Sequence, residues 1–278
     1  MKPLDSLKLQ QEIGVDEVFE NAPTNKFTKG QPQNIAIKQE VEPKKIVQSA
    51  PAPIIKEEEV SMPKASAAAP VSIATAPSAA IKEAQSLADK AKTLAELEAA
   101  VRSFEGCALK KTANKTVFCD GNPKAEVMLI GEAPGANEDM EGIPFCGQSG
   151  KLMDEVFAAA GFNRKDNLYI TNTVFWRPPG NRKPTPEELD ICRPFVEKHI
   201  GLISPKVVIL VGGTAVESIL KSKGAVSSMR GKFYPYSNNY LSDPIKIMVT
   251  FHPSYLLRQP SQKKQAWQDV LFLKNNMN

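Results

Sequence analysis

Short apolar runs alternate with helix-like apolar spacings along residues 86–278. The short runs have the length and composition of strands, and the stretches between them place apolar residues every three or four positions. We expect strands at residues 125–130, 168–175, 207–211 and 245–250, and helices at 152–160, 185–200, 214–220 and 261–274. Strands that alternate with helices build a parallel sheet covered on both faces. The pattern therefore predicts an α/β fold, a three-layer α/β/α sandwich with a central four-stranded parallel sheet.

Two helix starts carry the spacing of a capping box. Thr93 is followed three residues later by Glu96, and apolar residues recur at helical spacing over 94–104. Thr185 and Glu188 repeat the spacing at the start of a later helix. In a capping box each side chain accepts a hydrogen bond from the other residue's backbone N–H. The first box marks the opening helix of a folded domain, which we place at residues 86–278.

Residues 1–85 have a different composition. Pro/Ala-rich stretches such as 48–53 alternate with charge runs such as Lys56-Glu-Glu-Glu. Such a segment cannot bury enough apolar surface to offset the entropy of ordering it, which predicts a disordered tail. Apolar residues between positions 7 and 19 leave open a short helix or a motif that docks a protein partner.

Charge and targeting signals narrow the class of protein. The net charge is +4, and the ten lysines and ten acidic residues before position 83 cancel, so the positive excess lies on the domain. This excess is compatible with a nucleic-acid partner without being diagnostic of one. No apolar stretch is long enough to span a membrane, and the N-terminus lacks the features of a secretory or transit peptide. We expect a cytoplasmic monomer.

Each predicted strand ends in a polar loop marked by glycine or proline. In parallel sheets, ligands bind beyond the carboxyl ends of the strands. The loops are GEAPGANED at 131–139 with GIPFCGQSG at 142–150, TN at 171–172 with WRPPGNR at 176–182, GGT at 212–214, and HPSYLLR at 252–258. Loops of this kind converging on one edge of the sheet predict a functional site.

The ordered set GEAPGxxED, PFxGxSG, TNxxxxRPPGNRxPTPEE, GGTA and HPSYLLRxP resembles the family-4 uracil-DNA glycosylases of the uracil-DNA glycosylase superfamily. The resemblance runs from about residue 104 to the C-terminus. It implies an enzyme that flips uracil out of DNA and hydrolyses its N-glycosidic bond, initiating base excision repair. No Schiff-base lysine is evident in the motif loops, so hydrolysis without strand cutting is expected.

The resemblance also implies roles at the base. Asn172 offers an amide donor and acceptor to the uracil edge, and Phe145 stacks on the flipped ring. His252 stabilises the departing uracil anion as a neutral donor. A strand-end Asx cap for Asn172 and a core aromatic for Phe145 are the alternatives. The second histidine, His199, lies outside the motifs and is expected to be structural.

Water activation is assigned to Glu132, which either orients the water or stabilises the sugar cation. Glu138 and Asp139 are alternatives, although these acids could instead cap the following helix or pair with Arg182. Glycines at two further positions are expected to let backbone amides approach the base or sugar closely: Gly131 and Gly135.

Contacts to the DNA backbone are expected from basic side chains and from amides at a helix N-terminus. The candidates are Arg177, Arg182, Lys183, Gly213, Thr214 and Arg258. Solvated surface charge is the alternative for each cation. Residues 255–257 are expected to enter the duplex as a wedge, with a core role for Leu256 as the alternative.

An iron–sulfur cluster usually lies beside the site in the family that the chain resembles. The resemblance places its four ligand positions on Phe104, Cys107, Trp176 and Cys192. Since a cluster needs thiolate ligands, we expect no cluster and no other cofactor here, with the two aromatic rings filling the vacated volume. Cys119 and Cys146 lie at other offsets and would need a rebuilt pocket.

Two other functions stay open. The same fold could excise a different deaminated base, such as hypoxanthine, because pocket shape decides the base. Loss of the cluster could also accompany loss of catalysis, which would leave a DNA-binding module. The presence of Glu132, Asn172 and His252 together argues against the second alternative.

Overall fold

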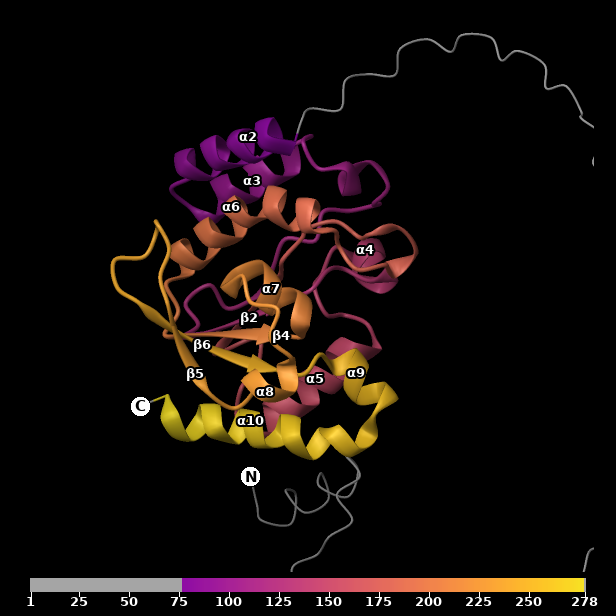
Figure 1. The fold of residues 1–278 in the computed structure, drawn as a ribbon, viewed down its shortest axis with the longest axis vertical. Coiled ribbons are helices and arrows are strands. Elements are labelled where there is room, and N and C mark those ends of the chain that lie inside the picture. Colours follow the sequence, from indigo (N-terminus) through magenta and orange to yellow (C-terminus); the bar gives the residue numbers. More distant parts are fainter. Residues whose placement is uncertain (1–76, 278) are drawn as a thin grey trace, which may run out of the picture. The chain divides into compact units, whose positions relative to one another are not determined.

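A six-stranded sheet runs through the computed structural model, which describes residues 77–277 (Figure 1). The strand order is β1-β3-β2-β4-β6-β5. Four neighbouring inner strands are parallel: β2 (Val127–Gly131), β3 (Leu168–Asn172), β4 (Val207–Val211) and β6 (Ile245–Thr250). They lie at the four predicted strands, although β3 ends three residues before the predicted end at 175 and β2 begins two residues after the predicted start at 125. The predicted α/β class is confirmed.

The predicted strand count was too low, because an antiparallel strand closes each edge of the sheet. These strands are β1 (Asp120–Gly121), which pairs with β3, and β5 (Phe233–Tyr236), which pairs with β6. β1 has two residues, too few for an apolar pattern. β5 contains Pro235, a residue that sheets accept at their edges and that argues against a strand in the sequence.

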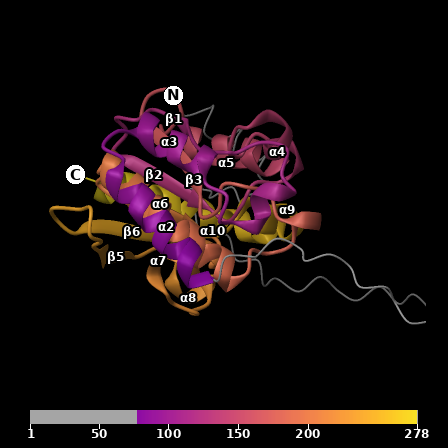
Figure 2. The same cartoon turned by 90° about the horizontal axis from the view of Figure 1, so that it is seen from above.

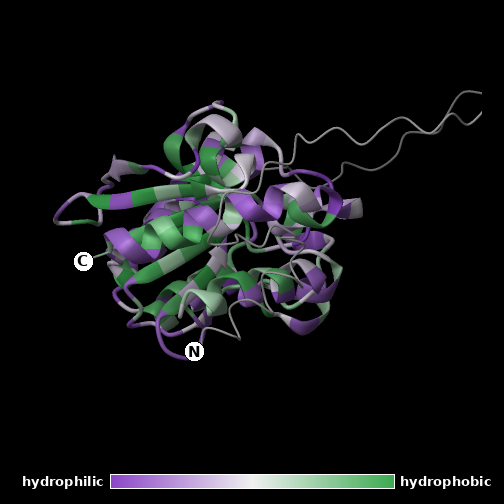
Figure 3. Ribbon diagram, turned by 90° about the horizontal axis from the view of Figure 1, so that it is seen from below, coloured by the Kyte–Doolittle hydropathy of each residue, from purple (hydrophilic) through white to green (hydrophobic). Residues whose placement is uncertain are grey.

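Helices cover both faces of the sheet and form the predicted three layers (Figures 1 and 2). One core joins the sheet to α2 (Pro77–Lys90), α3 (Leu94–Ser103), α6 (Pro186–Ile203) and α7 (Gly213–Leu220). The other joins it to α5 (Gln148–Ala159), α9 (Pro253–Arg258) and α10 (Lys263–Asn276). Along β2, Met128 and Ile130 enter the first core while Val127 and Leu129 enter the second. This alternation is the two-residue period of a strand, and Figure 3 shows the central strands as hydrophobic.

Shorter elements lie in the connecting loops. They are α4 (Ala136–Glu141), α8 (Val226–Met229), and the 3-10 turns η1 (Ala108–Lys111), η2 (Pro179–Asn181) and η3 (Pro260–Gln262). No helix within residues 77–277 is long and apolar enough to cross a membrane.

Helix α2 lies partly within the residues that the sequence assigned to the tail. Ala80, Ala84 and Ala88 recur every four residues on one face and are fully buried, and α2 packs against α6. Alanine suits a close helix–helix contact because it loses no side-chain entropy on burial. Residues 1–76, including the apolar segment at 7–19, lie outside the described residues, so the disordered tail stays a prediction.

The predicted capping boxes differ in outcome. At α6, the Thr185 hydroxyl accepts from the Glu188 N–H at 3.2 Å and the Glu188 carboxylate accepts from the Thr185 N–H at 2.7 Å, which confirms that box. At α3, the Thr93 hydroxyl accepts from the Glu96 N–H at 3.2 Å. The Glu96 carboxylate, however, accepts from the Lys92 N–H one residue earlier, so this box is only half formed.

Candidate active site

The carboxyl ends of the four parallel strands open onto one pocket of about 810 Å³. Every motif loop contributes to its wall, as the sequence predicted. The lining includes Glu132, Gly135 and Phe145 from the loops after β2, Arg182 and Lys183 from the loop after β3, Gly213 and Thr214 after β4, and His252 and Arg258 after β6. The topology therefore brings residues from 132 to 258 to a single concave surface.

Asn172 ends β3 beside Gly131, its register partner on β2. Its side chain is 1% exposed, and within the described residues neither its amide nitrogen nor its amide oxygen has a hydrogen-bond partner. A buried amide without partners is costly in a folded protein. Asn172 is therefore no Asx cap, and its amide is available to a ligand that reaches it.

Gly131 leaves room for both the Phe145 ring and the Asn172 amide, because it has no side chain. A Cβ at Gly131 would lie 2.4 Å from the Phe145 ring and 2.5 Å from the Asn172 amide oxygen, so no larger residue fits. The Phe145 ring lines the pocket, whereas Asn172 lies behind the pocket wall. The Phe145 ring, with Gly131 and the Asn172 amide next to it and behind the pocket wall, is called the floor of the site below.

His252 is held as a neutral imidazole with a defined tautomer. Its Nδ1 accepts from the Ser254 backbone N–H at 3.2 Å and lies 2.8 Å from the Ser254 hydroxyl. An Nδ1 that accepts leaves the ring proton on Nε2. Burial, with a contribution from the positive charge of Arg258, lowers the pKa of His252 to about 4. The imidazole is therefore a neutral Nε2–H donor at physiological pH, and its ring centroid lies 5.8 Å from that of Phe145.

Glu132 follows β2 directly and faces the first turn of α7. Its carboxylate accepts a 2.5 Å hydrogen bond from the Thr214 hydroxyl, and its carbonyl accepts from the Thr173 hydroxyl at 2.5 Å. Thr214 was predicted as a DNA contact through its backbone. Its side chain also orients the carboxylate expected to act on water, and the backbone contact stays a prediction.

The two alternative acids have structural partners. Glu138 accepts from the Gly135 N–H at 3.1 Å and caps α4, and it also accepts from the Gly147 N–H at 2.9 Å. Asp139 is buried and binds the backbone N–H groups of Asn114 and Lys115. A helix cap and an ion pair with Arg182 were the structural alternatives for these acids. Glu138 forms the cap, and neither acid pairs with Arg182.

The predicted DNA contacts separate into two kinds. Lys183 and Arg258 are exposed at the pocket rim. Arg182 also lines the pocket but makes a two-pronged ion pair with Glu188 at 2.8 and 2.7 Å. Arg177 donates to Asn181 at 2.8 Å within its own loop and does not line the pocket.

The expected wedge and the second histidine are also placed. Leu256 is 3% exposed in the core, which bears out the alternative for it, whereas Leu257 is 36% exposed beside Arg258. His199 is fully buried, accepts or donates a 2.6 Å hydrogen bond with the Tyr169 hydroxyl, and stacks on Phe118. It does not line the pocket, in agreement with a structural role.

Comparisons with known proteins cover the same region of the chain. A profile of the Uracil DNA glycosylase superfamily matches residues 118–271. The type-4 uracil-DNA glycosylase of Sulfurisphaera tokodaii is 34% identical over 181 residues, which are 64% of this chain and 81% of that protein. The type-4 enzyme of Archaeoglobus fulgidus is 34% identical over 182 residues, 64% of this chain and 90% of that protein. That of Saccharolobus solfataricus is 37% identical over 174 residues, 61% of this chain and 79% of that protein.

The matched span contains every residue that lines the pocket. The chain belongs to the uracil DNA glycosylase superfamily. The resemblance noted in the sequence is thereby confirmed for the family and its fold. The roles assigned to single residues of this superfamily member stay predictions.

The four positions that the resemblance assigns to an iron–sulfur cluster do not fit one. Phe104 and Trp176 are each 1% exposed in the same core as Cys107 and Cys192. The hydrogen bond between the two thiols lowers the pKa of Cys107 and, together with burial, raises the pKa of Cys192, so only one of the two cysteines is biased toward the thiolate form that a metal needs. Within residues 77–277, no three histidine, cysteine or acidic side chains converge as a metal site, so neither Cys119 nor Cys146 completes a set.

The sequence did not predict two residues that hold the site of this superfamily member in place. Ser254 sets the tautomer of His252, and its position two residues after the histidine in HPSY was an available signal. Arg164, in the loop between α5 and β3, donates to the backbone of the Phe145 loop. It lies outside every motif loop, so only the folded chain brings it to the site.

Proposed function

We propose that this protein excises uracil from DNA by hydrolysing the N-glycosidic bond. The observation that carries the proposal is the Asn172 amide, buried without a partner at the floor of the pocket. Uracil presents an N3–H donor and an O4 acceptor, which an amide oxygen and an amide nitrogen can pair with together. Cytosine presents the reverse pattern at these atoms. The type-4 relatives carry the same activity in their names.

Base binding in this proposal includes a movement of the Phe145 ring. The ring lies against Gly131 beside the amide, so an incoming base displaces it and then stacks on its face. Stacking between a base and an aromatic ring is worth about 1–3 kcal/mol. Flipping costs a few kcal/mol, which stacking and the amide pair would offset.

His252 and Glu132 would divide the chemistry. As the bond between C1′ and N1 breaks, its electron pair stays on uracil, and the Nε2–H of neutral His252 donates to O2 of the departing anion. The sugar gains positive charge, which the Glu132 carboxylate stabilises. Water then adds to C1′, and the proton that it loses passes through solvent to the uracil anion, which leaves as neutral uracil. The Glu132 carboxylate, which accepts a hydrogen bond from Thr214, would orient that water.

The DNA strand would be held at the pocket rim by Lys183 and Arg258, with backbone amides at Gly213 as further donors to phosphate. We also propose that the domain works as a monomer without a cluster, its volume filled by Phe104 and Trp176. Supporting this, large apolar rings occupy two of the four positions at which thiolates would be needed.

The test is incubation of the full chain with a fluorescent oligonucleotide that contains one uracil, followed by alkali and a gel. A second oligonucleotide carries hypoxanthine, and the visible absorbance and iron content of the same sample are recorded. Cleavage at uracil by a colourless, iron-free sample is the expected result. Cleavage of the hypoxanthine oligonucleotide alone would mean that hypoxanthine, and not uracil, is the substrate. Binding of both oligonucleotides without cleavage of either would favour the non-catalytic module. Iron at stoichiometric amounts would overturn the cluster-free proposal.

A further inference from the structure

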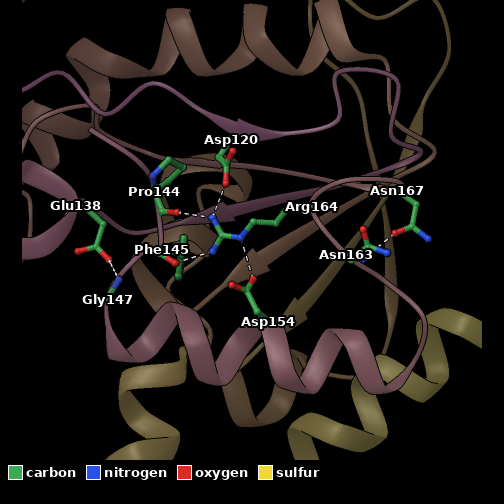
Figure 4. Close-up of polar contacts among 9 residues, drawn as sticks. All are labelled: Asp120, Glu138, Pro144, Phe145, Gly147, Asp154, Asn163, Arg164 and Asn167. Atoms are coloured by element: carbon green, nitrogen blue, oxygen red, sulfur yellow. Dashed lines mark hydrogen bonds and ion pairs between the residues drawn. The ribbon is translucent and has the colours of Figure 1, made fainter. Parts of the chain in front are cut away.

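Arg164 ties together three segments that lie far apart in the sequence (Figure 4). Its guanidinium donates to Asp154 on α5 at 2.9 Å and to Asp120 on β1 at 2.8 Å. It also donates to the backbone carbonyls of Pro144 at 2.7 Å and Phe145 at 2.6 Å. The side chain is only 18% exposed. A planar fork of donors can serve four acceptors in this way, whereas a lysine ammonium cannot reproduce the geometry.

The carbonyls that Arg164 binds belong to the segment that presents the Phe145 ring. Phe145 has φ of 53°, a left-handed conformation that a residue with a bulky side chain rarely adopts. Such a conformation persists only where surrounding contacts impose it. A Cβ at Gly150 would lie 1.7 Å from the Phe145 carbonyl oxygen, so the first turn of α5 also packs against this peptide.

The far side of the same loop is held by Glu138. Its carboxylate binds the Gly147 N–H at 2.9 Å and the Gly135 N–H at 3.1 Å, joining the Phe145 loop to the loop after β2. Figure 4 shows the contacts of Arg164 and Glu138 on opposite sides of the loop. With its backbone fixed on both sides, the loop leaves the Phe145 side chain as the part that can rotate.

We infer that Arg164 is a positioning residue for uracil, acting through the Phe145 backbone to aim the ring that stacks on the flipped base. The inference rests on the proposed function for its substrate. Arg164 does not line the pocket, so it touches neither base nor DNA there. Its two carboxylate partners more than balance its positive charge, so it adds no positive field for DNA, and orientation of the loop is its contribution to the site.

The test is a double-mutant cycle between Arg164→Met and Phe145→Ala, with single-turnover cleavage of the uracil oligonucleotide and thermal midpoint as readouts. Arg164→Met keeps much of the volume and removes every donor. We expect it to lower the cleavage rate at least about tenfold while the DNA Kd stays within about threefold, since misplaced groups slow chemistry without loosening the DNA contacts. In the Phe145→Ala background, the same change should have little further effect on rate, because the ring it positions is gone.

Controls separate this role from loss of stability. Arg193→Met removes a comparable partly buried arginine, paired with Glu197 at 2.6 Å on α6, and should lower the thermal midpoint without changing the cleavage rate. Arg164→Lys should restore only part of the rate. If Arg164→Met does not fold, Asp154→Asn, which removes one outer partner of the guanidinium, takes its place in the cycle. Equal rate losses in both Phe145 backgrounds, or no loss at all, would overturn the inference.

A readout independent of catalysis keeps the two proposals distinguishable. Hydrogen exchange of the Gly147 amide, which Glu138 protects, should become faster in Arg164→Met and stay unchanged in Arg193→Met. If the wild-type protein cleaves no uracil but this exchange difference appears, Arg164 holds the loop and the substrate assignment is wrong. If uracil is cleaved and the exchange difference is absent, Arg164 does not hold the loop.

Discussion

The floor and the rim of the pocket differ in the burial and the partners of their polar side chains. At the floor, Asn172 is buried without partners and Gly131 leaves no room for another atom. At the rim, Lys183 and Arg258 are exposed, and the neighbouring Arg182 is committed to Glu188. The unpaired amide at the floor lowers the stability of the folded protein but stays available to a base, whereas the exposed cations at the rim cost no stability. Base choice and catalysis should therefore depend on the floor, and DNA affinity on the rim.

Asn172→Ala is the change at the floor from which we expect the largest loss of cleavage rate. Removal of one preorganised donor from an active site typically costs about 10²–10³ in rate, and this change removes a donor and an acceptor. We expect at least that loss in single-turnover cleavage, with the DNA Kd within about threefold. Because the amide is buried unpaired, we also expect the free energy of unfolding to rise by about 1 kcal/mol.

The opposite pairing of activity and stability separates this variant from ordinary core damage. A matched surface change, Asn276→Ala on α10, should alter neither cleavage nor the denaturation midpoint measurably. An Asn172→Ala protein that cleaves at the wild-type rate would remove the amide from base recognition.

Gly131→Ala tests the fit of the floor with a single methyl group. The added carbon would overlap the Phe145 ring and the Asn172 amide, which lie 2.4 and 2.5 Å from its position. A misplacement of about 1 Å in an active site can cost about 10²-fold, and we expect a loss of that order in the cleavage rate. Gly161→Ala is a control for stability only, because the φ of Gly161 is +94° and no atom lies within 4 Å of the added carbon. Similar rates for both alanine variants would argue against a tight floor.

The part of this site that the sequence predicted is the part encoded at strand ends. The motif loops that contain Asn172 and His252 were placed at one edge because parallel strands deliver their carboxyl ends there, and the resemblance singled out the two residues within those loops. Arg164 was not predictable in the same way, because its role depends on Asp120 and Asp154, which are 44 and 10 residues away. Likewise, the commitment of Arg182 to Glu188 depends on a loop conformation that no periodicity encodes.

The fold shows the same division. Inner strands carry long apolar runs and were predicted, whereas β1 and β5 lie at edges where two residues or a proline suffice. Helix α2 was assigned to the tail up to residue 85 because alanine-rich composition resembles a linker. Only its packing against α6 shows that the alanines form a buried face.

The pH dependence of cleavage tests the electrostatics of His252. The active form is neutral, and burial together with Arg258, against the opposing charge of Glu138, sets its pKa at about 4. At pH 5 about nine tenths of such a group is neutral, against a few per cent for an ordinary histidine with a pKa near 6.5. We expect the cleavage rate at pH 5 to stay within about twofold of its value at pH 7 and to fall as the pH passes below 4.

The same depressed pKa has a consequence for stability. Since the unfolded chain takes up a proton near pH 6.5 and the folded chain does not, stability is fully present above that pH and is lost as the pH falls toward 4. Buried His199, whose pKa is lowered to about 3, contributes in the same direction, so chemical denaturation must accompany the rate profile. A rate that falls at pH 6 while the protein stays folded would mean that His252 titrates normally or is not the donor.

The smallest expected effects belong to the rim. Lys183→Ala and Arg258→Ala should each weaken DNA binding several-fold and lower the slope of log Kd against log salt by about one, because each removes one phosphate contact. Single-turnover rates at saturating protein should not change. Arg182→Ala should behave differently, because the Arg182 guanidinium is held by Glu188. We expect this change to lower the thermal midpoint and to leave the salt slope nearly unchanged. A salt slope that falls equally for Arg182 and Lys183 would show that the ion pair opens on DNA, so that this part of the rim exchanges an internal contact for a phosphate, whereas the Asn172 amide at the floor has no internal contact to give up.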